Sequence, residues 1–164
     1  MALKSTSTYS FAQVSAVLKY GKGTVIKLSE GGVGEEGIQI ESALDTNIMK
    51  YGSDGSVQHS LRIARPGTMK VQVMRNNTLN SELANAYNNT TATAAAHGLM
   101  VLTISDSASG ESTTCTGVAF KKLPANLYKM DAEPITWEFD VGNIFYEPGK
   151  INDDDAQDGG AAQP

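Results

Sequence analysis

The sequence predicts a mainly β protein, an antiparallel β-sandwich or barrel with one flanking α-helix at about residues 79–89. Three observations predict this fold class. Short segments in which apolar and polar residues alternate recur along the chain, and turns rich in Gly, Asn and Asp separate them. One segment has the helical period instead. The 164 residues provide one domain of ordinary size, and a chain of this length can bury a core without disulfides.

The first part of the chain contains short alternating segments separated by glycine-rich turns. The expected strands span residues 9–17, 24–28, 37–41 and 47–51. Residues 31–34 are expected to form a flexible loop. Asp54 and Gly55 follow the fourth segment, and Asp-Gly is among the stronger short-range signals for a β-hairpin turn.

The next alternating segment spans residues 57–63, in which Val57, His59, Leu61 and Ile63 alternate with polar residues. A second alternating segment spans residues 69–74, and a Pro-Gly turn lies between the two. This pattern predicts a hairpin of residues 57–63 with 69–74, with one buried and one solvated face. His59 is then expected to be a hydrogen-bonded core residue.

The period changes at Leu79, because Leu79, Leu83, Ala86 and Tyr87 share one face of a helix. Asn77 is a suitable N-cap. Strands are expected again at the segments 99–105, 112–122 and 135–141, and the last of these either ends there or continues to Tyr146. The predicted division is a β domain over residues 1–147 and an acidic tail over residues 148–164.

Candidate chemical sites are few. Residues 32–37 fit the pattern G-x-G-x-x-G, but a strand is expected after them, and Glu35 and Glu36 would repel a phosphate. His59, His97 and Cys115 lack the spacing of metal ligands, and Cys115 is expected to be a small buried apolar group. We therefore expect no catalytic residue, no metal site and no cofactor, and a protein that is not an enzyme.

The formal net charge is −5, and part of it is concentrated in Asp153, Asp154, Asp155 and Asp158. No stripe of basic residues could neutralise a row of phosphates, which argues against tight binding of DNA or RNA. The first residues lack the apolar core of a signal peptide, and no segment is long enough to span a bilayer. The expectation is a protein made in a cytoplasm, without a membrane anchor.

An ordered set of segments resembles the tail tube proteins of contractile bacteriophage tails. The resemblance extends from about residue 8 to residue 146. The segments that carry it span residues 8–11, 35–41, 45–49, 52–55, 59–61, 118–124 and 137–140. No single motif is diagnostic, and the order and spacing of the set carry the resemblance.

The resemblance implies a fold similar to the tube-forming hemolysin-coregulated protein of type VI secretion. Six subunits would form a ring, rings would stack into a hollow tube, and four strands of each subunit would join into one inner barrel. The implied partners are further copies of the chain, the tail sheath, the tape-measure protein and the baseplate and terminator proteins. DNA would pass through the lumen without specific binding. The implied location is the virion tail, assembled in the host cytoplasm.

Two sets of residues are candidates for the surfaces of such a tube. Polar residues expected to face solvent are candidates for the lumen: Glu41, Gln58, Ser60, Arg62, Lys70 and Gln72. Residues in and around the Asp-Gly turn are candidates for ring stacking, together with residues 1–8: Leu44, Asp45, Asn47, Met49, Tyr51, Asp54 and Gly55.

Three alternatives stay open at this point. The first is a related assembly protein, such as a baseplate or tail-completion ring or a type VI secretion tube. The second is a carbohydrate- or receptor-binding β domain, which would need aromatic residues on exposed loops. Trp137, however, lies in an alternating strand and is expected in the core. The third is an enzyme on a β scaffold, for which no convergent set of polar residues is visible.

Overall fold

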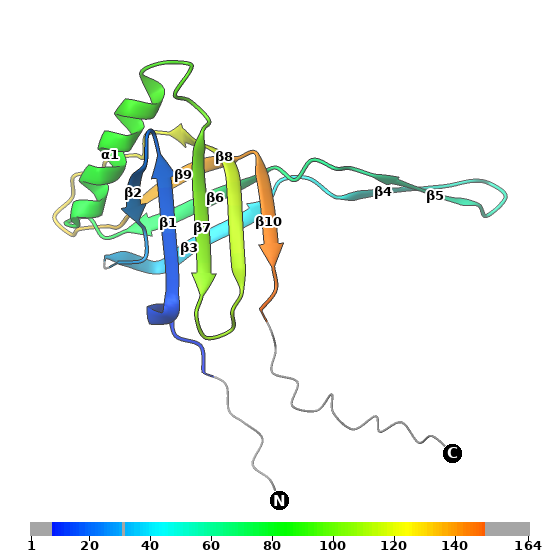
Figure 1. Ribbon diagram of the computed structural model, residues 1–164, viewed down its shortest axis with the longest axis horizontal. Helices are drawn as coiled ribbons and strands as arrows, with labels where there is room; N and C mark the ends of the chain where they lie inside the picture. The colour runs from blue at the N-terminus through cyan, green and yellow to red at the C-terminus, as the bar shows by residue number, and fades with distance from the viewer. Residues whose placement is uncertain (1–7, 31, 150–164) are drawn as a thin grey trace, which may run out of the picture.

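The computed structural model describes residues 8–30 and 32–149, and it shows a mainly antiparallel β protein with one α-helix in this part of the chain (Figure 1). A short 3-10 helix, η1, precedes the first strand. The elements in chain order are η1 (Phe11–Gln13), β1 (Val14–Tyr20), β2 (Thr24–Lys27), β3 (Val33–Ser42), β4 (Asn47–Tyr51), β5 (Val57–Leu61), β6 (Gly67–Val73), α1 (Thr78–Thr91), β7 (Met100–Asp106), β8 (Ser112–Lys122), β9 (Ile135–Val141) and β10 (Asn143–Glu147).

The strands of the body form two sheets that share β8. In the five-stranded sheet the order is β2-β1-β7-β8-β10, and in the four-stranded sheet it is β8-β9-β6-β3. The first part of β8 pairs with β7 and β10, and its last residues, from Ala119 onward, pair with β9. In Figure 1 the five-stranded sheet stands upright, and β3, β6 and β9 cross behind it. The two sheets therefore face each other across a common core.

The core lies between the sheets and under α1. β6 and β9 alternate strictly, so that Met69, Val71, Trp137 and Phe139 point inward and are buried. Phe120 contacts three aromatic rings at centroid distances of 4.6–5.7 Å, and the shortest of these is to Phe139. Aromatic contacts of this kind add to the stabilisation that comes from burial.

Helix α1 covers one end of the sandwich, at the upper left of Figure 1. Asn77 caps it, because its side-chain oxygen accepts a hydrogen bond from the Leu79 amide at 2.8 Å. Leu79, Leu83 and Ala86 are buried on its inner face, as the spacing predicted. Asn80 accepts a hydrogen bond from the Trp137 indole N–H at 3.0 Å, which ties the helix to β9. No helix in the described residues is both long enough and apolar enough to cross a membrane.

Two details of the predicted elements are wrong, and the structure decides one alternative that the sequence left open. The segment 9–17 is not one strand, because residues 11–13 form η1 and β1 begins at Val14. Residues 31–34 are only partly a loop, since β3 begins at Val33. The strand 135–141 ends at Val141 and does not continue to Tyr146. After Gly142 the separate strand β10 begins, and it pairs with β8 instead of β6. Gly142 lies against the backbone of Gly117, and a side chain there would crowd that crossing.

Candidate assembly surfaces

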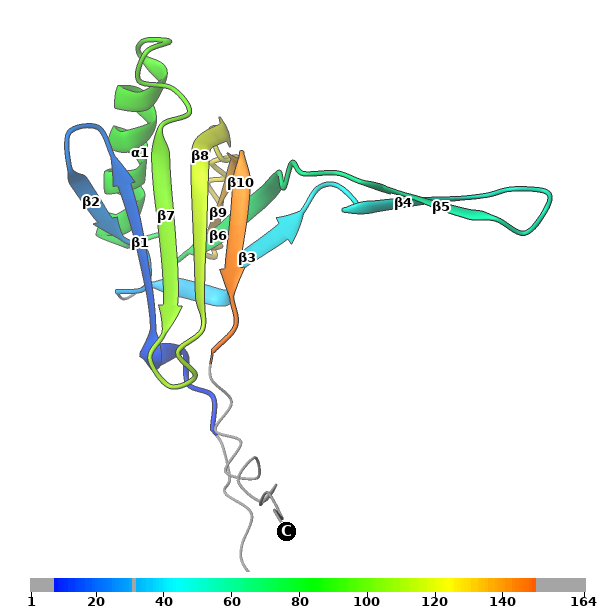
Figure 2. The ribbon, with the colours of Figure 1, turned by 45° about the vertical axis from the view of Figure 1, so that its right-hand side comes forward.

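A two-stranded arm, residues 43–65, projects from the body of the subunit. Figures 1 and 2 show it extending away from both sheets, and β4 and β5 pair only with each other. The register places Asn47 opposite Leu61, Met49 opposite His59 and Tyr51 opposite Val57. Residues that are opposite in an antiparallel pair lie on the same face. One face of the arm therefore carries Met49, Tyr51, Val57 and Leu61 together.

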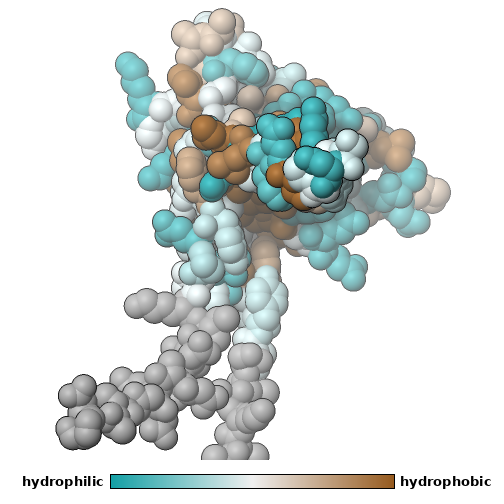
Figure 3. All heavy atoms as spheres, turned by 90° about the vertical axis from the view of Figure 1, so that its right-hand side faces the viewer, coloured by the Kyte–Doolittle hydropathy of each residue, from teal (hydrophilic) through white to brown (hydrophobic). Residues whose placement is uncertain are grey.

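The other face of the arm is more polar. It carries Ser60 opposite Ile48 and Gln58 opposite Lys50. All five residues of β5 are exposed to solvent, and the Leu61 side chain is 76% exposed. Figure 3 looks onto the tip of the arm and shows hydrophobic residues at the surface beside hydrophilic ones. The arm thus presents an apolar face to solvent in the isolated subunit, which is typical of a surface that another protein covers.

Two predictions about this segment are wrong. Residues 57–63 do not form a hairpin with residues 69–74, because β5 pairs with β4 while β6 pairs with β3 and β9. His59 is not a core residue, since it is exposed and makes a hydrogen bond to the Asn47 side chain at 3.0 Å. The apolar residues of β5 do share a face, as predicted. That face is not covered by anything in the described part of the subunit.

The tip of the arm is the turn at residues 52–55. The Asp54 carboxylate accepts hydrogen bonds from the Ser56 hydroxyl at 2.6 Å and the Ser56 amide at 3.0 Å. These hydrogen bonds lower the pKa of Asp54 below its ordinary value, because they stabilise the ionised carboxylate. The predicted Asp-Gly turn is present, with Gly55 at a φ of 84°. The tip therefore carries a fixed negative charge.

The outer face of the four-stranded sheet is polar. Lys70 lies opposite Gln39 on β3 and opposite Glu138 on β9. Thr68 lies between Glu41 and Asp140 in the same way. The sheet alternates, so its inner face holds the core while these side chains face solvent. Three of the predicted lumen residues, Glu41, Lys70 and Gln72, lie on this surface.

The charges on this surface nearly balance. Glu41, Glu138 and Asp140 are acidic, whereas Lys70 and Lys122 are basic, and the Lys122 ammonium lies 3.9 Å from the Glu138 carboxylate. Lys70 is directly opposite Glu138 in the register. An acid therefore sits beside each base, and the surface offers no cluster of cations that would hold a phosphate backbone.

Both edges of the four-stranded sheet are open in the described residues. β3 pairs with β6 on one side only, and residues 119–122 of β8 pair with β9 on one side only. Unpaired strand edges present free N–H and C=O groups that can pair with another chain. A sheet with two open edges, a buried inner face and a polar outer face has the properties that ring closure through strand pairing requires.

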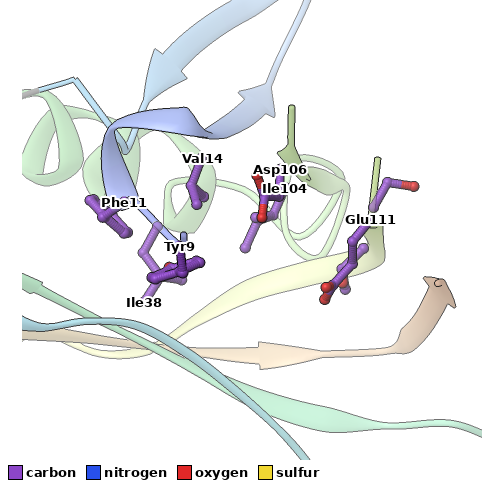
Figure 4. Close-up of a pocket in the computed structure, with 9 residues that line it drawn as sticks. Tyr9, Phe11, Val14, Ile38, Ile104, Asp106 and Glu111 are labelled. Carbon is purple, nitrogen blue, oxygen red and sulfur yellow. The ribbon is translucent and has the colours of Figure 1, made fainter. Parts of the chain in front are cut away.

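A cavity of about 220 Å³ lies between the sheets near η1, and it offers no catalytic arrangement (Figure 4). Tyr9, Phe11 and Ile38 form its apolar side. Asp106 and Glu111 come from the β7–β8 hairpin, where Asp106 accepts hydrogen bonds from the Ala108 amide and the Ser109 hydroxyl. The Asp106 carboxylate thus stabilises a turn. The cavity lies at the end of the sandwich where η1 and the β7–β8 hairpin are located, and this end is open.

Two further titratable side chains in the described part of the chain have shifted pKa values. Cys115 is fully buried, and burial raises the pKa of its thiol to about 11, which keeps it protonated and inert. Desolvation, followed by the nearby Glu111 carboxylate, raises the pKa of the Tyr146 phenol. Among the described residues, no group of His, Cys, Asp and Glu side chains is arranged to hold a metal ion.

The comparisons with known proteins identify the family. The family model described as "Bacteriophage PhiTE tail tube protein" matches residues 6–148. The chain belongs to this family. Tail tube proteins of bacteriophages are structural components of the tail, so the chain is a structural virion protein, as the resemblance implied.

Solved structures share the fold of this tail tube protein. One is a chain of an extracellular contractile injection system, "PVC sheath-tube complex in extended state", with a TM-score of 0.52 and 10% identity over 81% of this chain and 88% of that chain. Another is the anti-feeding prophage cap ("AFP tube terminating cap"), with a TM-score of 0.53 and 8% identity over 91% of this chain and 97% of that chain. No curated protein matches the chain by sequence.

The candidate residues of this tail tube protein fall on two surfaces. The predicted stacking residues in and around the Asp-Gly turn all lie on the arm: Leu44, Asp45, Asn47, Met49, Tyr51, Asp54 and Gly55. Thr8, from the other candidate segment, is exposed ahead of η1. The lumen candidates are divided, because Gln58, Ser60 and Arg62 are on the arm and only the other three are on the four-stranded sheet. Residues 1–7 and the aspartates of the predicted acidic tail lie outside the described residues.

Proposed function

We propose that six copies of this tail tube protein form a ring, and that the rings stack into the hollow inner tube of a contractile tail. The outer face of the four-stranded sheet lines the channel. The open edges of β3 and β8 pair with neighbouring subunits, so that six four-stranded sheets close into one inner barrel. The observation that carries this proposal is the polar sheet face between two open edges. Closure of the barrel would pair the strand edges that are exposed in the isolated subunit.

The balanced charges of the outer sheet face support a channel for DNA. A wall with a basic surplus would bind phosphates, whereas Glu41, Glu138 and Asp140 outnumber Lys70 and Lys122 on this face. Glu41, Lys70 and Gln72 are therefore retained as lumen residues. The tape-measure protein occupies the channel during assembly in the host cytoplasm, and the genome later passes through it into the host.

The arm, with the stacking candidates, contacts the neighbouring ring. Its apolar face is covered there, and Gln58, Ser60 and Arg62 on its other face point toward the channel or solvent. The outside of the tube contacts the sheath, and its ends contact the baseplate and terminator. The tube domain spans residues 1–147, and the acidic segment 148–164 is separate from it.

Electron microscopy of the purified protein over a concentration series tests this proposal. Hollow tubes or six-fold rings are the expected result, and a map of such a tube would show which sheet faces the channel. A tube whose channel is lined by the five-stranded sheet would refute the lumen assignment. Particles that stay monomeric at every concentration, even with baseplate components added, would refute the assembly itself.

A second function, a ring that ends a tube, is supported by one observation. The similarity to a tube-terminating cap covers 91% of this chain. A cap would form a single ring layer, whereas a tube protein forms stacks of many layers. The length distribution in the same micrographs separates the two, because a cap gives discs that do not lengthen with concentration.

A further inference from the structure

The loop between β8 and β9, residues 123–134, exposes apolar side chains. Leu123, Leu127 and Tyr128 are all at least half exposed, and the Met130 side chain is fully exposed, at 105% of its reference area. Such a group of apolar residues on a loop contributes nothing to the core of the subunit. A patch of this kind marks a surface that a partner covers.

The loop is held in place by Arg75, from the segment between β6 and α1. The guanidinium donates hydrogen bonds to the Leu127 carbonyl and to the Asn126 side-chain oxygen, the latter at 2.9 Å. It also lies over the Tyr128 ring, 4.9 Å from the centroid. Lys129 and Glu133 form an ion pair at 2.8 Å within the loop. The apolar side chains are therefore displayed on an ordered scaffold, which lowers the entropy cost of binding.

A cavity of about 210 Å³ lies beside this loop. Its lining residues are Met74, Arg75, Asn76, Asn77, Ala132 and Pro134. Arg75 is the charged residue of the lining, so the cavity suits a small group with a negative charge. The two asparagines add amide groups that can donate hydrogen bonds.

The tip of the arm has matching properties. It is a narrow turn, it carries the ionised Asp54 carboxylate, and Tyr51 and Val57 flank it as an exposed apolar pair. The loop offers the complementary arrangement, with the Arg75 guanidinium beside exposed apolar residues. Complementary charge next to apolar contact is the pattern of a specific interface.

The two surfaces lie at opposite ends of the subunit. In Figure 1 the arm extends to the right, and the loop lies at the left beside the start of α1. Contacts between different surfaces at opposite ends join copies head to tail and can be repeated without limit. We infer that the arm tip of one subunit seats against the loop 123–134 and the Arg75 cavity of a second copy. This inference rests on the proposed function, in which the second copy belongs to the adjacent ring of the tube.

Disulfide trapping tests this contact. Ser53 is exposed at the arm tip, and Ala132 is exposed in the lining of the cavity, so we choose the double variant S53C/A132C. The native Cys115 is buried and protonated, and it does not compete. After mild oxidation and quenching of free thiols, a non-reducing gel should show a ladder of dimers, trimers and longer covalent chains. Each single variant can form at most a dimer, since it has one accessible thiol.

The matched control is S53C/K22C, in which the second thiol is in the exposed β1–β2 turn, away from the loop. It should give no ladder. Tubes without a ladder for S53C/A132C, or an equal ladder for the control, would overturn this inference while the tube function stands. If the wild-type protein forms neither rings nor tubes and S53C/A132C gives no ladder, both proposals are wrong.

A second variant, Met130→Ser, measures the same contact without cross-linking. Because the Met130 side chain is fully exposed, the melting temperature of the isolated subunit should not change. The critical concentration for assembly should rise about tenfold, as expected when an interface loses most of one buried apolar side chain. Assembly at the wild-type concentration would show that the loop faces another partner, such as the sheath, and would overturn the inference.

Discussion

Leu61→Thr separates the stability of the subunit from the stability of the assembly. Leu61 is on the apolar face of the arm, opposite Asn47, and its side chain is 76% exposed in the subunit. Threonine keeps a high strand propensity, so β5 should still pair with β4. The substitution should leave the fold intact and remove apolar surface only from the contact between subunits.

The expected magnitude follows from the exposed area. Complete burial of a leucine side chain is worth about 1.5–3 kcal/mol, and roughly three quarters of that is still available to an interface at this position. The loss is then about 1–2 kcal/mol for each subunit. Since about 1.4 kcal/mol corresponds to a factor of ten in an equilibrium constant, the critical concentration for assembly should rise about 5- to 30-fold.

Sedimentation of assembled protein over a concentration series measures this change, and thermal unfolding of dilute subunits gives the melting temperature. Gln58→Thr is the matched control, because Gln58 is on the same strand but on the other face of the arm. It should assemble like the wild type. An unchanged critical concentration for Leu61→Thr would refute the role of the apolar face, and a fall in its melting temperature would show that Leu61 supports the subunit instead.

The other predictions concern the core and the channel. Trp137→Phe removes the hydrogen bond to Asn80 and should lower the free energy of unfolding by about 1–2 kcal/mol, measured by urea denaturation with circular dichroism, whereas no loss would mean that solvent replaces the bond. Gly67→Ala should reduce the yield of folded protein, because a Cβ there would collide with the Glu41 carbonyl oxygen and Ile144; wild-type yield and stability would contradict this. Cys115 should react with a thiol reagent only after unfolding. Because burial raises the pKa of its thiol from 9.0 to about 11, the free energy of unfolding should fall as the pH rises through that interval. A Cys115→Ala variant should not show this fall. Thr68→Lys adds a cation to the outer sheet face and should slow genome delivery by phage, measured as infection efficiency, while microscopy still shows tubes. Delivery at the wild-type rate would argue that residue 68 does not face the channel.

The sequence predicted elements whose signals are local. The alternation over residues 135–141, the helical spacing from Leu79 and the cap at Asn77 all depend on neighbours in the chain, and each is present in the structure. The turn at Asp54 and Gly55 is present as well, although the pairing of β4 with β5 across it was not the predicted one. Where turn chemistry or periodicity decides the structure, the amino-acid sequence is sufficient.

The local sequence does not determine what an apolar face packs against. The alternation in residues 57–63 has the same period whether the apolar side packs into a core or against another copy of the chain, which is why the hairpin with 69–74 was wrong and His59 was misplaced. The loop 123–134 was missed for a related reason. Arg75 and Tyr128 are far apart in the sequence, and only the fold brings them together. The apolar Leu127, Tyr128 and Met130 between two prolines were the available signal.

The arm also has a mechanical consequence. It is a ribbon of two strands that pair only with each other. It is held to the body at its base, where the Ala43 amide donates a hydrogen bond to the Pro66 carbonyl and the Ile144 amide of β10 donates one to the Arg65 carbonyl. A ribbon of two strands has no other layer packed against it, so it bends and twists more easily than a packed sheet. If neighbouring rings are joined by six such ribbons, each joint is elastic. A long tail built this way can curve under load by flexing its arms, while every ring keeps its shape and the bore stays open.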